Sequence, residues 1–158
     1  MSELSNNEYH RCIVLHRLAA AYYHLGESDN ALEYSTRAIS IKTIGGKLGS
    51  RIFETHSRIL SSLNNYDSIK FAEKSLEIKK ALGDRRGIQM SLLNLSQICQ
   101  YVDADLSSSY AEEAYKLAEL VNDYSGQLFA LKRLKTLHRK DCEKKQQIQL
   151  KIDKLAKK

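Results

Sequence analysis

Apolar residues along the chain recur at the spacing of a helix rather than of a strand. Leu15, Leu18, Ala19 and Tyr22 stand at positions i, i+3, i+4 and i+7, which places them on one face of a helix. Three later segments repeat this spacing: Phe53, His56, Ser57 and Leu60; Leu92, Leu95, Ser96 and Cys99; and Leu131, Leu134 and His138. The pattern predicts four helices, each with one packing face. His56, His138 and Cys99 belong to these faces, so we expect them to pack inside the protein rather than to do chemistry.

A second helix is predicted after each of the first three. Its mark is a series of small residues spaced four and then three apart: Ala31, Ser35 and Ala38; Ser68, Ala72 and Ser75; Ser107, Ala111 and Ala114. Small residues let two helix backbones approach closely. The segments 26–29, 64–67 and 103–105 separate the two helices and are rich in residues that cap the next helix. Each unit is therefore predicted to be a helix, a tight turn and a second helix.

These units recur with a period near 40 residues. Three similar stretches, 45–49, 83–87 and 122–126, begin 38 and 39 residues apart. They begin with Gly45, Gly83 and Asn122, residue types that tolerate the left-handed conformation at the end of a helix. The repeats are expected at about 10–44, 47–82, 85–121 and 124–140, followed by a polar helix at 141–157, all within one domain, 1–158. A closed helical bundle is the alternative, but a bundle does not require its turns to recur at one period.

The first unit resembles the tetratricopeptide repeat, in the variety of roughly 40 residues that signalling adaptors and bacterial sensor proteins contain. The resemblance is carried by Leu15-x2-Leu18-Ala19-x2-Tyr22-x3-Gly26-x4-Ala31-x3-Ser35-x2-Ala38. It covers about residues 10–140. Later units depart from the signature at His56, at the turn residues Asn64 and Asp103, and at Lys135. The resemblance implies an all-α, right-handed α-solenoid of antiparallel helix hairpins with about seven to eight helices.

Composition and motifs narrow the function. The chain of 158 residues has no proline and only 7 glycines, which favours helix. We find no HExxH motif, no paired CxxC, no phosphate loop and no Gly-x-Ser-x-Gly, and we predict a protein that is not an enzyme and uses no metal or cofactor. Its apolar runs are far shorter than the roughly 20 residues of a membrane span. The odd, widely spaced cysteines Cys12, Cys99 and Cys142 favour a reducing, cytoplasmic location. A periplasmic or other location would apply if the sequence were part of a longer exported chain.

The resemblance also implies where a partner binds. In such solenoids the first helix of each hairpin lines the concave surface, through side chains one step away from the packing series. The predicted groove residues are His16, Tyr23, His24, Arg51, Glu54, Arg58, Gln97, Gln100, Tyr101, Lys132 and Arg139, and the same rule also selects Ser61, Met90, Thr136 and Lys140. Arginine pairs with carboxylates, glutamine bonds a peptide backbone and tyrosine offers flat apolar contact. We expect a protein- or peptide-binding scaffold whose partner carries acidic groups, as a sensing or docking segment of a larger signalling protein.

The charge distribution leaves a second reading open. The net charge of +6 is uneven, because the segment from Lys132 onward carries +8 and everything before it carries −2. Such a tail could bind nucleic acid through its phosphates, with an affinity that falls as salt rises. The tail also contains Ile148, Leu150, Ile152 and Leu155, whose spacing instead suggests an amphipathic cap or the entry to a coiled coil, and with it oligomerisation.

Overall fold

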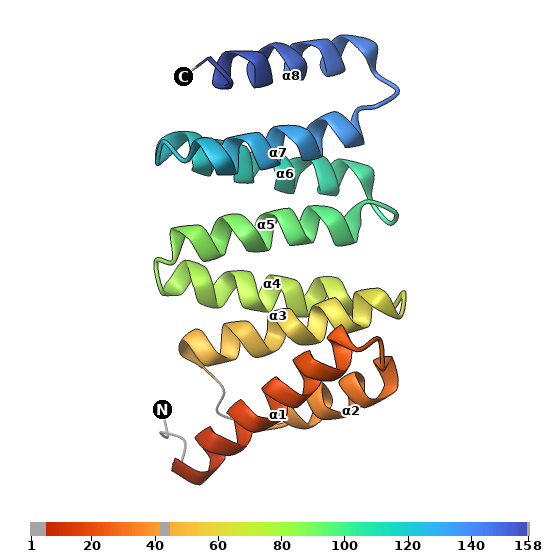
Figure 1. Ribbon diagram of the computed structural model, residues 1–158, viewed down its shortest axis with the longest axis vertical. Helices are drawn as coiled ribbons and strands as arrows, with labels where there is room; N and C mark the ends of the chain where they lie inside the picture. The colour runs from red at the N-terminus through yellow and green to blue at the C-terminus, as the bar shows by residue number, and fades with distance from the viewer. Residues whose placement is uncertain (1–5, 42–44, 158) are drawn as a thin grey trace. The chain divides into compact units, whose positions relative to one another are not determined.

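The computed structural model of the protein describes residues 6–41 and 45–157, and all regular secondary structure in these ranges is α-helical. Eight helices follow one another in this part of the chain (Figure 1). Lys158, which belongs to the predicted basic tail, and residues 1–5 lie outside these ranges. The contacts divide the chain into two compact units, Met1–Asp84 and Arg85–Lys158, which are described separately. One domain over 1–158 stays a prediction.

Unit 1 is a pair of helical hairpins. It contains α1 (Asn6–His24), α2 (Ser28–Ile39), α3 (Gly46–Ser62) and α4 (Asp67–Ala81). Helix α1 packs against α2 and α3 against α4, and α3 also contacts both α1 and α2. Its core includes two clusters, one of Cys12, Leu15, Ala38 and Ile52 and one of Ala19, Ala31 and Ile59. Each cluster draws residues from both hairpins, so each hairpin covers the apolar side of the other.

Unit 2 repeats this arrangement. It contains α5 (Arg85–Cys99), α6 (Ala104–Leu120), α7 (Tyr124–Leu137) and α8 (Cys142–Leu155). Helices adjacent in sequence pack together, and α5 also contacts α7. The buried apolar residues of the unit are Leu92, Leu95, Cys99, Ala111, Ala114, Ala118, Ala130, Leu131 and Leu134. The predicted helical hairpins and the predicted packing face of each first helix are confirmed.

The small residues of the second helices are buried, as predicted. Nine of them face the hairpin interior: Ala31, Ser35, Ala38, Ser68, Ala72, Ser75, Ser107, Ala111 and Ala114. Serine hydroxyls bridge the helices where they come close. Ser57 Oγ donates to the Ser68 carbonyl at 2.7 Å between α3 and α4, and Ser107 Oγ donates to the Ser96 carbonyl at 2.6 Å between α5 and α6. The buried serines therefore find acceptors inside the hairpin, as buried polar groups must.

The turns confirm two of the three predicted helix ends and correct the third. Gly83 and Asn122 have φ of 66° and 55°, in the left-handed region that follows a helix. The prediction for Gly45 is wrong, because its φ is −123° and it is the N-cap of α3. Helices α3, α5 and α7 start 39 residues apart, so Gly45 corresponds to the residue before a helix and not to the one that ends it.

The last helix is mostly polar and carries four apolar residues, Ile148, Leu150, Ile152 and Leu155. No residue of α8 is buried, and the Asp141 carboxylate caps it by accepting from the Lys144 amide at 3.0 Å. A helix was predicted at 141–157, and α8 confirms it with ends one or two residues inside those bounds. Among the described residues, no helix is both long and apolar enough to cross a membrane.

Candidate functional site

The predicted groove residues of unit 1 lie on two helices in contact. His16, Tyr23 and His24 belong to α1, and Arg51, Glu54 and Arg58 belong to α3. We call the outward side chains of these two helices the unit 1 face. The corresponding outward side chains of α5 and α7 form the unit 2 face.

Electrostatic coupling joins His16 to α3. Burial lowers the pKa of His16, the Arg51 and Arg17 charges lower it further, and the Glu54 carboxylate opposes them. His16 is half-buried and Arg51 is exposed. The prediction therefore brought together His16 and two charged residues of α3 that act on its pKa across the α1–α3 contact.

A second contact on the unit 1 face is aromatic. The Arg58 guanidinium carbon lies 5.6 Å from the centroid of the Tyr23 ring, within the range of a cation–π interaction. The His24 ring meets Tyr23 edge-on, with 5.7 Å between centroids. Arg58 and His24 are exposed, so the edges of this cluster are open to a partner.

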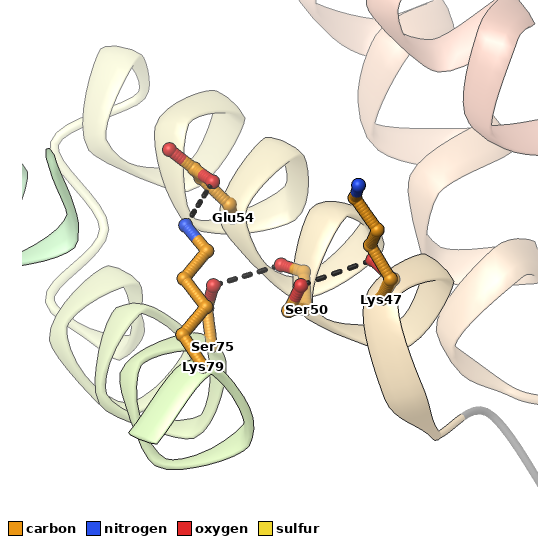
Figure 2. Close-up of polar contacts among 5 residues, drawn as sticks. All are labelled: Lys47, Ser50, Glu54, Ser75 and Lys79. Carbon is orange, nitrogen blue, oxygen red and sulfur yellow. Dashed lines mark hydrogen bonds and ion pairs between the residues drawn. The ribbon is translucent and has the colours of Figure 1, made fainter. Parts of the chain in front are cut away.

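Glu54 has a partner within the hairpin. Its carboxylate accepts a hydrogen bond from Lys79 Nζ (Figure 2). The two atoms are 2.6 Å apart, and the side chains of Lys79 and Glu54 are only 7% and 28% exposed. A buried ammonium needs such a counter-charge, because its desolvation is costly. Next to this pair, Ser75 Oγ donates to the Ser50 carbonyl and Ser50 Oγ donates to the Lys47 carbonyl (Figure 2). Glu54 is thus held by a residue of α4. The sequence prediction missed this contact, because it considered only the first helix of each hairpin.

The predicted residues of unit 2 occupy helix faces and turns. Gln97 on α5 and Lys132 on α7 are exposed. Gln100 and Tyr101 lie just after α5, and Tyr101 is 89% exposed. Arg139 lies beyond the end of α7 at Leu137, in the turn that leads to α8. The chain therefore places two of the five on the helices themselves and three in the turns that follow them.

Arg133 organises this end of unit 2, although sequence analysis counted it only as part of the basic tail. From α7, its guanidinium donates to Ser96 Oγ at 3.1 Å, to the Ser96 carbonyl at 2.7 Å and to Gln100 Oε1 at 2.6 Å. Burial lowers its pKa and Tyr101 opposes that shift, while the group stays protonated. The Gln100 amide oxygen, predicted to contact a partner, is therefore engaged by Arg133.

A cleft of about 410 Å³ opens at the N-terminal ends of α5 and α7. We call it the α5–α7 cleft. Its lining residues are Arg85, Arg86, Gln89, Met90, Leu93, Val121, Asp123, Ser125, Gly126 and Phe129. Met90 and Phe129 are 57% and 68% exposed. Met90 was selected from the sequence and Phe129 was not, although it stands one repeat after Met90.

A second cleft, of about 390 Å³, lies among α6, α7 and α8. Leu131, Leu134 and Ile148 line it, together with two glutamates and three lysines. Lys151 lies 5.2 Å from the centroid of the Tyr115 ring of α6. His138 forms part of the same wall and shares a hydrogen bond of 3.0 Å with Ser108 Oγ, which confirms that it packs against a neighbouring helix. Within the described residues, no group of three or more histidine, cysteine or acidic side chains could hold a metal ion.

Comparison with known proteins identifies the class of fold. No protein-family model matches the sequence, and no curated protein matches it. The crystal structure of a Rap protein complexed with Competence and Sporulation Factor is similar, with a TM-score of 0.75 at 16% identity. The match covers 97% of this chain and 44% of that chain, so the protein spans less than half the length of the Rap protein. At this identity the similarity shows the fold alone: a tetratricopeptide-like helical repeat, as the sequence predicted.

Proposed function

We propose that the protein is a non-catalytic binding scaffold that holds a protein or peptide against the outward sides of its odd-numbered helices. The observation that carries the proposal is the exposure of recognition groups there. Arg51 and Arg58 project outward from α3, Gln97 from α5 and Lys132 from α7, while most of the packing series of the same helices is buried. Exposed arginine and aromatic groups are typical of interfaces.

The chemistry of these faces favours a partner with carboxylates. An arginine fork binds a carboxylate through two parallel hydrogen bonds, and glutamine can pair with a peptide backbone. The Rap protein of similar fold was crystallised in complex with Competence and Sporulation Factor, which supports a binding role for this architecture. We place the protein in the cytoplasm, as a sensing or docking segment of a signalling protein.

Selection from a random peptide library displayed on phage tests the proposal. The full chain should enrich acidic, extended sequences, and calorimetry should show saturable binding of the enriched peptides. Arg58→Glu and Tyr101→Ala should each weaken binding, Arg58→Glu by roughly tenfold or more because it places like charges together. Lys70→Glu, at an exposed lysine of the second helix α4, is the matched control and should leave the affinity unchanged.

Two results would count against the scaffold. One is a library that yields no enriched sequence. The other is an enriched peptide that binds Arg58→Glu, Tyr101→Ala, Met90→Ser and the unsubstituted chain equally well. The thermal melting curves of all variants should overlap, since each changed side chain is exposed or lies in a turn.

Nucleic-acid binding through α8 is the second candidate. The observation in its favour is that Lys144, Lys145, Lys151 and Lys154 of α8 are all exposed. If it is right, mobility of random-sequence DNA or RNA should shift in the presence of the protein, with strong salt dependence. Replacing the four lysines by glutamine should abolish the shift, and a shift that survives this change would exclude α8 as the binding element.

A further inference from the structure

The α5–α7 cleft combines an apolar lining with a cationic edge. Met90 and Leu93 come from α5 and Phe129 from α7, and Val121 adds a fourth apolar side chain from the preceding turn. Large apolar side chains exposed side by side are uncommon on a soluble surface and mark places where a partner binds. The volume of about 410 Å³ fits one large side chain with its backbone.

Packing between the helices shapes the cleft. Gln89 of α5 is buried and lies against Gly126 of α7, where any side chain would overlap the Gln89 amide. Glycine at this position therefore lets the start of α7 approach α5 closely. The close approach sets Met90 and Phe129 on facing helices of the same cleft.

The charged residues that line the cleft indicate what kind of partner segment binds there. Arg85 and Arg86 line the cleft and are exposed, and no ion pair to either is found among the described residues. The only carboxylate in the lining is that of Asp123, whose Oδ1 accepts from the Gly126 amide at 3.0 Å as the cap of α7. The edge of the cleft therefore carries two arginines and one carboxylate, and that carboxylate already caps α7. An acidic segment is the complement.

We propose that the α5–α7 cleft receives one large apolar side chain of an extended partner segment, and that Arg85 and Arg86 bind carboxylates on either side of that anchor. The inference rests on the proposed function and specifies the partner of unit 2. Apolar burial supplies the affinity, and the arginines set the acidic preference and the salt dependence.

Fluorescence anisotropy with labelled peptides tests this. The probe is a short capped peptide with one leucine flanked by glutamates. Two matched peptides replace the leucine by serine or every glutamate by glutamine. The first should bind the full chain, and each replacement should weaken binding, the loss of leucine by about tenfold to hundredfold.

The protein variants make the same test from the other side. The double variant Met90→Ser/Phe129→Ser should weaken binding of the leucine peptide by a similar factor. Arg86→Gln should weaken this binding less and reduce its dependence on salt. Leu150→Ser is the matched control, because Leu150 is also an exposed apolar residue, 62% exposed, but lies on α8. Circular dichroism should show the same helix content in all variants.

Several outcomes would overturn the inference. Equal affinity for the leucine and serine peptides would show that no apolar side chain anchors the partner in the cleft. This result does not depend on how any protein variant folds. Binding that depends on Arg58 but not on Met90 and Phe129 would leave the scaffold function intact and move the partner to unit 1. A change of oligomeric state in the double variant, with no effect on peptide affinity, would assign the cleft to a second copy of the chain. Failure of every acidic peptide, library-derived ones included, would reject the scaffold function itself.

Discussion

One position of the repeat differs in chemistry between the two units. Arg51 on α3, Met90 on α5 and Phe129 on α7 follow one another at intervals of 39 residues, and all three are exposed. Unit 1 therefore has a charge where unit 2 has two apolar side chains. Beside this position unit 1 buries Ser50 and Ile52, and unit 2 buries the similarly small Ser91 and Ala130 together with the larger, polar Gln89. The packing framework is thus shared, and the outward positions are where the units diverge in what they can bind.

The polar groups inside the two units differ as well. Unit 1 buries a histidine, His56, and a lysine, Lys79, which pairs with the half-buried Glu54. Unit 2 has leucines, Leu95 and Leu134, at the repeat position of His56, and Arg133 bridges α7 to α5. Unit 1 should therefore respond to pH and to loss of single charges more than unit 2 does, which gives three ways to test the contrast.

Acidification should give the largest difference. His56 is 4% exposed, shares a 2.8 Å hydrogen bond with Ser35 Oγ and meets the Phe71 ring edge-on. Burial lowers its pKa from 6.5 to about 4, so the folded protein binds this proton less readily than the unfolded chain. The resulting stability is complete above pH 6.5 and is lost as pH falls toward 4, by about 3 kcal/mol.

Urea denaturation at pH 7 and pH 4 measures this effect. His56→Leu, which introduces the unit 2 residue, should remove most of the pH dependence, and His16 should leave a smaller remainder of the same sign because its pKa is also lowered. Ser35 Oγ also donates to the Leu32 carbonyl, and this bond does not involve His56. An unchanged pH dependence in His56→Leu would show that His56 is not the titrating group.

Loss of the counter-charge to Lys79 should rank second. Glu54→Gln removes the carboxylate that accepts from the Lys79 ammonium, and we expect a loss of about 2 kcal/mol in the free energy of unfolding, less than for a fully dry pair because Glu54 is partly exposed. Lys79→Met removes the buried charge and should cost less. The exposed Arg37–Glu33 pair is the control, and Glu33→Gln should change stability by no more than about 0.5 kcal/mol. Equal losses in Glu54→Gln and Glu33→Gln would mean that Lys79 is well solvated.

The serine bridges should give the smallest difference. Ser57→Ala removes the donor to the Ser68 carbonyl and should cost about 1 kcal/mol. Ser107→Ala should cost less, because Arg133 Nη2 still donates to the Ser96 carbonyl. Thermal unfolding of the two single variants and of the double variant Ser107→Ala/Arg133→Ala tests whether Arg133 makes up for the lost serine hydrogen bond. A larger loss for Ser107→Ala than for Ser57→Ala would show that Arg133 does not compensate.

The sequence was sufficient to predict the hairpins, because burial requires a periodic apolar face and a period can be read from one chain. Gly45 was wrongly predicted to end a helix, because glycine is common both before and after helices. Only the backbone dihedrals distinguish these two positions. Phe129 could have been found by counting 39 residues from Met90. The partners of Glu54 and Gln100 could not have been found from the sequence. They lie 25 and 33 residues away, and the contacts depend on how neighbouring helices pack.

Methyl and amide NMR of the full chain during titration with the acidic leucine peptide tests the central claim most directly, since it locates a guest without any substitution. Saturable shifts of Met90, Leu93 and the Phe129 amide, with Leu150 and the α6 residues unchanged, are the predicted result. Shifts concentrated on α6 or α8 would contradict the account, because the partner would then lie away from the outward sides of the odd-numbered helices.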